Sequence, residues 1–301
     1  MARSPKAVLA SLATLKPGLD QLYDGFNAHH STRDPIWTVR RFTDLADQEV
    51  VAFLAAALAF GRVQSVIQTV EAVVAVMGES PAGFVRDFTP ERAAAFDGLG
   101  HRWIRSRDLA ALAWQLHQMV RDHGSLEGFF AAGHAASAES VEDGLESFSR
   151  RAMALDLKAV YGRARPVPGV AYFFSRPSSG GACKRLNLFL RWVVRCDAVD
   201  LGVWTAVRPA QLIVPLDTHI IRVGRCLRMT ARVSPGWKMA MDITRTLRQL
   251  DPHDPVRYDF AMCHLGMIGA CGFSTTRANT RCPLHAVCRP AGRRPSRTRR
   301  P

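Results

Sequence analysis

The chain contains 301 residues, of which 48% are hydrophobic, enough to form one large domain or two closely packed ones. Its formal net charge of +14 at pH 7 favours a polyanionic partner, and part of this charge lies in residues 289–301, which contain arginines but no acidic residue. The longest apolar run, residues 50–60, is shorter than the roughly 18 residues of a membrane-spanning helix. We therefore expect no membrane segment and no membrane partner.

Helical periodicity dominates the chain. Asp44 precedes the first strong apolar segment, and Val66 and Val70 recur at helical spacing before Gly78, a typical helix stop. The expected helices are residues 48–60, 62–77, 90–96, 106–123, 125–132, 141–155, 182–195, 218–227, 237–249 and 255–271. No alternating stretch of useful length competes, so the sequence predicts an all-α protein. Residues 161–181, rich in Gly, Pro, Ser and Arg, are the best candidate for a boundary between two lobes.

The most informative segment is SSGGACKRLNLFLRWVVR, residues 178–195. Small residues at its start allow backbone N–H groups to approach an anion, and the positive end of the following helix favours the same guest. Apolar residues then recur at helical spacing and leave charged residues available for phosphate contacts. The expected DNA-binding residues are Ser179, Gly180, Gly181, Arg185 and Arg191, with Arg62 as a further cleft residue.

Two residues of this region are candidates for catalysis. Lys184 lies near the start of the expected helix, and Asp217 directly precedes another helix after the apolar run 212–216. An amine and a carboxylate can act as a nucleophile and its electrostatic partner. The simpler alternatives are that Lys184 only faces phosphate or solvent and that Asp217 only caps its helix. His219 is expected to be a structural partner rather than a general base.

Two segments carry a family resemblance. ACKRLNLFL (182–190) resembles the second helix of the helix-hairpin-helix motif in base-excision DNA glycosylases, with Lys184 and Asn187 at the lysine and asparagine of that motif. PLDTHIIRV (215–223) resembles the glycosylase segment that holds the catalytic aspartate, which is Asp217 here. The resemblance implies a two-lobed helical bundle, in which Lys184 forms a Schiff base with the sugar of an unstacked damaged nucleotide and Asp217 stabilises positive charge.

Most of residues 20–290 also resembles a bacterial family of proteins of unknown function that lies near this superfamily. The pattern is visible in LYDGFNAHH (22–30), RRFTDLADQEVVAFLAAALAFGRVQS (40–65), VDLGVW (199–204) and DPVRYDFAMCHLGM (254–267). The resemblance divides the chain into an N-terminal helical region (1–165), a helix-hairpin-helix glycosylase-like region ending in a Cys-rich loop (166–290) and a basic tail (291–301) that we expect to be disordered.

The late cysteines raise the question of a metal. Cys282 and Cys288 reproduce the last spacing of the four-cysteine loop that holds an iron–sulfur cluster in some of these glycosylases, but Asn279 stands where a second ligand is expected. The candidate ligands are therefore Cys263, Cys271, Cys282 and Cys288, with His264 or His285 completing a zinc site as an alternative. An iron–sulfur cluster, zinc and no metal all stay open.

The leading functional hypothesis is a DNA-repair glycosylase, with or without abasic-site lyase activity, whose partner is damaged duplex or single-stranded DNA. The alternative is a noncatalytic helix-hairpin-helix DNA-binding protein that has lost excision, and action on RNA or a free nucleoside is a third possibility. The odd number of cysteines favours reduced thiols, so we expect a cytoplasmic, nucleoid-associated protein with no obligate protein partner.

Overall fold

The computed structural model describes residues 5–26, 34–162, 168–267, 284 and 287. All regular structure in this part of the chain is helical, which confirms the predicted all-α class. The elements are α1 (Pro5–Phe26), α2 (Ile36–Val39), α3 (Leu45–Ala57), α4 (Val63–Met77), α5 (Pro81–Arg86), η2 (Pro90–Phe96), α6 (Ser106–His123), α7 (Leu126–Ala131), α8 (Glu142–Ala154), α9 (Lys158–Tyr161), α10 (Pro168–Ala171), η3 (Pro177–Ser179), α11 (Lys184–Val194), η4 (Pro209–Gln211), α12 (Thr218–Cys226), α13 (Trp237–Leu250) and α14 (Asp259–Met267).

Most of the expected helices are present, and side-chain caps explain where α3, α7 and α12 begin. The Asp44 carboxylate accepts hydrogen bonds from the backbone N–H groups of Ala46 and Asp47, so α3 begins at Leu45, earlier than predicted. The last helix begins only at Asp259, because residues 255–258 form turns. Helix α1 was missed by the sequence analysis, and it contains Pro17, which lacks a backbone N–H for the helical ladder.

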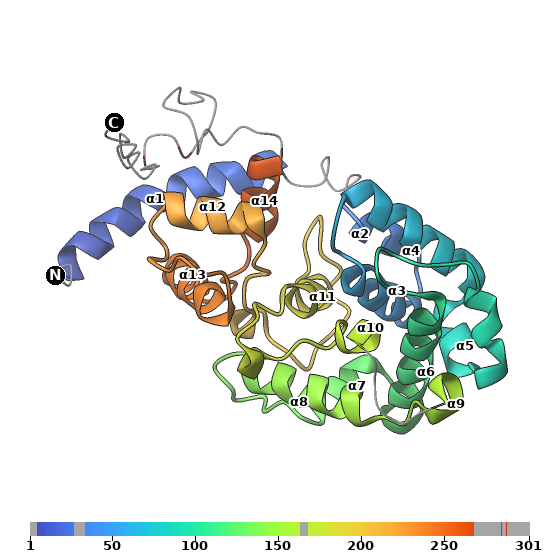
Figure 1. The fold of residues 1–301 in the computed structure, drawn as a ribbon. Coiled ribbons are helices and arrows are strands. Elements are labelled where there is room, and N and C mark those ends of the chain that lie inside the picture. Colours follow the sequence, from blue (N-terminus) through green and yellow to red (C-terminus); the bar gives the residue numbers. More distant parts are fainter. Residues whose placement is uncertain (1–4, 27–33, 163–167, 268–283, 285–286, 288–301) are drawn as a thin grey trace, which may run out of the picture.

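The helices form two groups around α11. Figure 1 shows α1, α12, α13 and α14 together on one side and α2 to α6 on the other, with α11 between them. Helix α11 packs against α3, and α14 packs against both α12 and α1, so the first helix and the last described helix share a side of the molecule. The predicted boundary at residue 165 falls within residues 163–167, outside the described residues.

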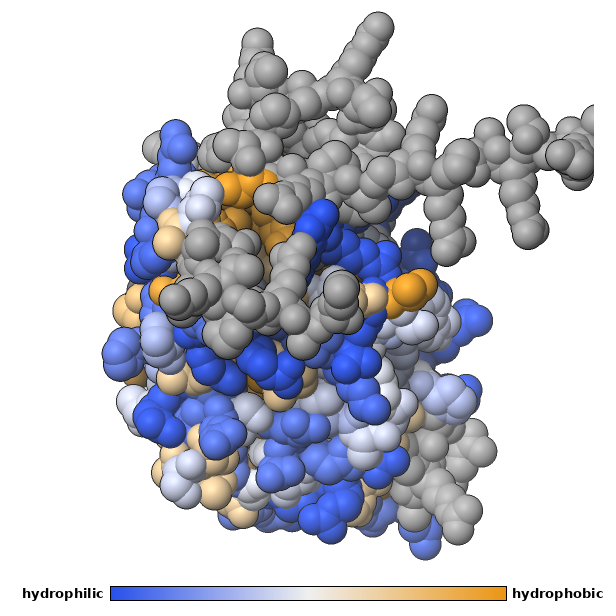
Figure 2. Space-filling model, turned by 90° about the vertical axis from the view of Figure 1, so that its left-hand side faces the viewer, coloured by the Kyte–Doolittle hydropathy of each residue, from blue (hydrophilic) through white to orange (hydrophobic). Residues whose placement is uncertain are grey.

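A single hydrophobic core runs through the described residues, and large aromatic side chains occupy its centre. Phe53 of α3 contacts Phe189 of α11 edge to face, with ring centroids 5.1 Å apart, and Phe189 contacts Trp204 in the same way. On the face drawn in Figure 2, hydrophilic side chains predominate and apolar ones gather mainly near the upper edge. Among the helices that the structure describes, none combines the length and apolarity needed to cross a membrane.

Candidate functional site around Lys184

Lys184 is the first residue of α11, and an unusual backbone conformation precedes it. Cys183 is buried and adopts φ +48°, which brings the chain sharply into the helix. The half-buried Lys184 side chain extends away from α11, and its Nζ donates to the carbonyl oxygen of Ala59 at 3.4 Å. The amine therefore lies beside the turn that joins α3 to α4.

Three aromatic rings gather at this turn. Phe60 stacks on Trp103, with ring centroids 4.8 Å apart and an angle of 27° between the planes. Tyr172, which follows α10, meets both rings edge to face, at 4.9 Å from Phe60 and 5.0 Å from Trp103. Trp103 remains 48% exposed, so an aromatic surface faces solvent at the turn whose Ala59 carbonyl oxygen accepts from the Lys184 amine.

Arg185 lies beneath this aromatic surface. Its guanidinium packs against the Tyr172 ring, with Cζ 3.4 Å from the centroid, and donates to the Tyr172 carbonyl oxygen. Burial lowers the pKa of Arg185 to about 10, which leaves it charged at neutral pH. Arg185 is only 8% exposed, so it does not make the direct phosphate contact expected from the sequence. Its buried charge instead adds positive potential to the aromatic surface.

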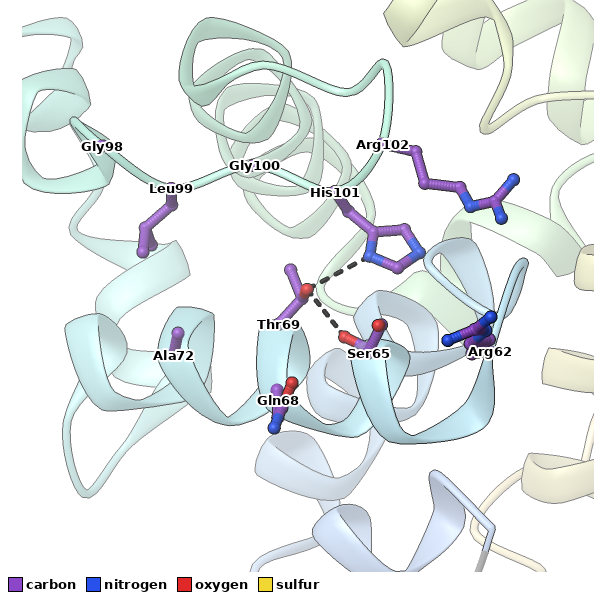
Figure 3. A pocket seen from close by; sticks show the side chains of 10 residues that line it. All are labelled: Arg62, Ser65, Gln68, Thr69, Ala72, Gly98, Leu99, Gly100, His101 and Arg102. Atoms are coloured by element: carbon purple, nitrogen blue, oxygen red, sulfur yellow. Dashed lines mark hydrogen bonds between the residues drawn. The ribbon is translucent and has the colours of Figure 1, made fainter.

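A polar pocket of about 410 Å³ adjoins the turn between α3 and α4. It is lined by Arg62, Ser65, Gln68, Thr69, Ala72, Gly98, Leu99, Gly100, His101 and Arg102, and Figure 3 shows these side chains. His101 Nε2–H donates to the Phe60 carbonyl oxygen at 2.7 Å, and the Thr69 hydroxyl lies 3.1 Å from His101 Nδ1. These bonds join the pocket to the turn that carries the aromatic surface.

The Arg102 side chain lies over this turn. Gly61 has φ +95°, a conformation that favours glycine, and a Cβ at this position would lie 2.7 Å from Arg102 Nε, so a larger residue here would displace the Arg102 side chain. Arg102 itself has φ +56°, an uncommon conformation for a residue with a side chain. Arg102 and Cys183 are two of the three described non-glycine residues with positive φ, and both adjoin this site.

The backbone N–H groups before α11, which the sequence suggested would bind an anion, mostly have acceptors within the protein. The N–H groups of Ser179 and Gly180 donate within the η3 turn, to Arg176 and Pro177 carbonyl oxygens at 3.1 and 2.9 Å. The Gly180 carbonyl oxygen in turn accepts from Trp237 N–H at the start of α13, at 3.1 Å. Ser179, Gly180 and Gly181 are exposed, but two of these three amides have an internal acceptor instead of being open to phosphate.

Arg191 is part of the core and not of the surface. Its Nε donates to Asp200 at 3.2 Å, its Nη1 donates to Asp259 at 2.6 Å, and the residue is 2% exposed. Burial alone would lower the pKa of Arg191, but the two carboxylates raise it above its usual value. The phosphate contact expected for Arg191 is corrected accordingly, because its charge is matched within the protein.

Asp217 caps α12, as the sequence predicted. Its Oδ1 accepts from Ile220 N–H at 2.7 Å, and its Oδ2 accepts from the Cys263 thiol of α14 at 3.1 Å. Among the described contacts, Lys184 bonds to Ala59 and Asp217 to Ile220 and Cys263, so none of them joins the amine to the carboxylate.

Of the candidate metal ligands, Cys263 and His264 lie in the described residues. Burial raises the pKa of the Cys263 thiol, and the negative charges of Asp217 and Asp259 raise it further. His264 is buried, and its Nδ1 lies 3.0 Å from the Phe260 carbonyl oxygen. The described residues contain no group of three or more His, Cys, Asp or Glu side chains able to hold a metal ion. Cys271, Cys282, Cys288, Asn279 and His285 lie outside the described residues.

Comparison with known proteins gives a family. The model of a family of proteins of unknown function, DUF2400, matches residues 34–268. The chain belongs to this family. No curated protein and no solved structure matches the chain.

The DUF2400 match includes every residue of the site built above, from Phe60 to Lys184 and Asp217. It is shorter than the reach of 20–290 expected from the sequence, and it ends before Cys271, Cys282 and Cys288. Arg102, Trp103 and Tyr172 were missed by the sequence analysis. A signal for two of them was present, because adjacent Arg and Trp residues in a short connection between helices are typical of exposed binding residues.

Proposed function

We propose that this DUF2400 protein is a DNA base-excision glycosylase in which Lys184 supplies the nucleophile and Asp217 the carboxylate. The observation that carries the proposal is the position of the Lys184 amine. It lies at the start of α11, bonded to Ala59 beside an exposed aromatic surface and two exposed arginines, Arg62 and Arg102. This combination suits a nucleotide, since bases stack on aromatic rings and phosphates bind cations.

The chemistry assigned to Lys184 is nucleophilic substitution at the sugar. With its amine uncharged, Nζ attacks C1′ of the deoxyribose, and the bond from C1′ to the base breaks with its electron pair leaving on the base, which takes up a proton. The amine nitrogen loses a proton, and its lone pair forms the second bond to C1′ as the C1′–O4′ bond breaks with its electron pair leaving on O4′, which takes up a proton. The product is an open-chain sugar joined to Nζ by a protonated Schiff base. Water then hydrolyses this adduct and releases the lysine.

Asp217 has an electrostatic role in this proposal. Its negative charge stabilises the positive charge that develops on the sugar as the base departs. For this role Oδ2 gives up its hydrogen bond from the Cys263 thiol and faces the substrate. Oδ1 keeps its hydrogen bond from Ile220 N–H and so continues to cap α12.

A noncatalytic DNA-binding protein is the second candidate, and one observation favours it. Lys184 and Asp217 have separate partners, Ala59 and Cys263, instead of a shared one. In this case Lys184 contributes only charge, and Lys184→Arg retains full DNA affinity and no chemistry is lost.

The test is borohydride trapping on duplex and single-stranded oligonucleotides that carry an abasic site, oxidised guanine, oxidised pyrimidine or uracil. The proposal predicts a covalent adduct with the wild-type protein that is absent from Lys184→Met and Lys184→Arg. Asp217→Asn keeps a capping oxygen for Ile220 and loses the charge, so we expect slower adduct formation with an intact fold. If no adduct forms and a base-release assay is also negative, while DNA still binds, the noncatalytic protein becomes the better description.

A further inference from the structure

Trp103 presents one face to solvent in a fixed orientation. Its other face stacks on Phe60 at 4.8 Å, and the Tyr172 ring abuts it at 5.0 Å, yet 48% of the residue is exposed. An aromatic ring that is held by its neighbours loses little conformational entropy when a second planar group stacks on it. The exposed face is therefore prepared for a flat ligand such as a nucleobase.

Two exposed arginines belong to the segments that carry Trp103 and its stacking partner Phe60. Arg102 precedes Trp103, and Arg62 follows the turn that carries Phe60. Figure 3 shows both arginine side chains at the end of the pocket opposite Leu99 and Ala72. In the described part of the chain neither guanidinium has a carboxylate partner, unlike Arg232, which pairs with Asp242 at 2.7 Å.

The backbone that carries Arg102 has an uncommon conformation. Arg102 adopts a positive φ, and its Nε lies so close to Gly61 that a Cβ there would be 2.7 Å away. Residues with a side chain and a positive φ cluster at active sites and ligand-binding sites. The buried charge of Arg185 under Tyr172 adds positive potential to the same surface.

The pocket itself has the size and polarity of a small-ligand subsite. Its volume of about 410 Å³ lies in the range of ligand pockets. The Ser65 hydroxyl and the Gln68 amide offer hydrogen bonds along its wall, whereas the Thr69 hydroxyl donates to the Ser65 carbonyl oxygen at 2.9 Å. A phosphate with part of its sugar fits this space better than an apolar molecule, because the arginines stand at one end and polar groups line the remainder.

We propose that Trp103, Arg62 and Arg102 form a subsite for one unstacked nucleotide of single-stranded DNA. The base stacks on the exposed face of Trp103, and the adjoining phosphate binds the two guanidinium groups at the mouth of the pocket. In a duplex the base faces are covered by their neighbours, so Trp103 cannot stack and only the phosphate contacts remain. The subsite deepens the proposed function and rests on it for the choice of DNA, but its test measures binding alone.

The first experiment is fluorescence anisotropy with a labelled single-stranded oligothymidylate and the full chain. Trp103→Ala is expected to weaken binding about tenfold, within the range for loss of one base–aromatic stack, and Trp103→Phe to retain most of the affinity. Trp37→Ala is the matched control, because Trp37 is 49% exposed and belongs to α2, outside the subsite. Its affinity should equal that of the wild-type protein.

The second experiment measures the salt dependence of the same binding. The slope of log affinity against log salt is negative. Arg62→Gln and Arg102→Gln should each make it less steep by about 0.7, the value for one lost phosphate contact on a single strand. Arg232→Gln, which removes a cation already paired with Asp242, should leave the slope unchanged.

The subsite would be overturned if a correctly folded Trp103→Ala protein bound with wild-type affinity, or if Trp103→Ala and Trp37→Ala lost the same affinity. It would also be overturned if the protein bound duplex DNA, or RNA of the same sequence, more tightly than single-stranded DNA. A free mononucleotide that binds as tightly as the oligonucleotide would assign the pocket to a metabolite instead. Trapping separates the two proposals. Trp103-dependent binding without any adduct contradicts only the glycosylase, and adduct formation with wild-type affinity in Trp103→Ala contradicts only the subsite.

Discussion

Replacement of Arg191 by methionine tests whether this arginine belongs to the core or to a DNA-binding surface. Its guanidinium bonds to Asp200 at 3.2 Å and to Asp259 at 2.6 Å. Methionine fills much of the same space but leaves both carboxylates buried without this cation. Removing one partner from a buried ion pair costs about 3–5 kcal/mol, so we expect the free energy of unfolding of Arg191→Met to fall by about 4 kcal/mol at pH 8.

The assay is urea unfolding followed by far-ultraviolet circular dichroism, repeated at pH 5. The loss should be smaller at pH 5, because Asp259, left without its cation, takes up a proton and a neutral carboxyl group is less costly to bury, while Asp200 keeps its ion pair with Arg195. The matched control is Arg232→Met. Its ion pair with Asp242 is exposed, and pairs of this kind contribute about 0–1 kcal/mol.

A double variant separates the pair from the packing of the side chain. Arg191→Met with Asp259→Asn removes the carboxylate that has lost its ion-pair partner, whereas Asp200 keeps Arg195, so the double variant should be more stable at pH 8 than Arg191→Met alone. Equal losses in Arg191→Met and Arg232→Met would refute the reasoning. A reduced salt slope of DNA binding in Arg191→Met, with stability unchanged, would return Arg191 to the DNA surface.

Two further predictions concern Asp259 and Gly61. Burial raises the pKa of Asp259 to about 7, against the opposing charge of Arg191, from an ordinary value of 3.8. The folded protein therefore holds this proton more tightly, so the contribution of Asp259 to stability is greatest below about pH 4 and declines up to about pH 7. Asp259→Asn should flatten this part of the stability profile in urea titrations, and an unchanged profile would contradict the shift. Gly61→Ala and Gly78→Ala should each lose about 1–3 kcal/mol, because both glycines have positive φ, +95° and +77°. Only Gly61→Ala should also weaken binding of single-stranded DNA, since it displaces Arg102 while a Cβ at Gly78 meets nothing within 4 Å; equal binding by both variants would contradict the role of Arg102.

The helical class and several helix ends were predictable because the interactions behind them are local. A helix is built from hydrogen bonds between residues four apart, and a cap such as Asp44 or Asp217 bonds to an N–H two or three residues ahead. Both aspartates were recognised beside an apolar periodic segment. Helix α1 escaped because its interior Pro17 is a signal for a break, whereas packing of α1 against α14 and α13 overrides it.

The candidate site was predictable only in part. Lys184 and Asp217 were identified from motifs, and Arg62 from its place after the turn at Gly61, but nothing local connected them with Trp103 or Tyr172. The bond from Lys184 to Ala59 and the stacking of Trp103 on Phe60 join segments that are distant in the chain. A helical pattern carries no information about which other segment covers a given face.

The sequence by itself determined that the chain is helical, where α12 is capped, and that the protein carries a large positive charge. Only the tertiary structure decided which positive charges are available to a ligand. In the sequence, Arg191 and Arg62 look equally able to contact a phosphate. In the structure, Arg191 is buried and paired with Asp200 and Asp259, whereas Arg62 is exposed. The physical reason is that a buried cation needs partners that compensate its lost hydration. For Arg191 these partners are carboxylates, and the fold brings one of them from another helix, α14.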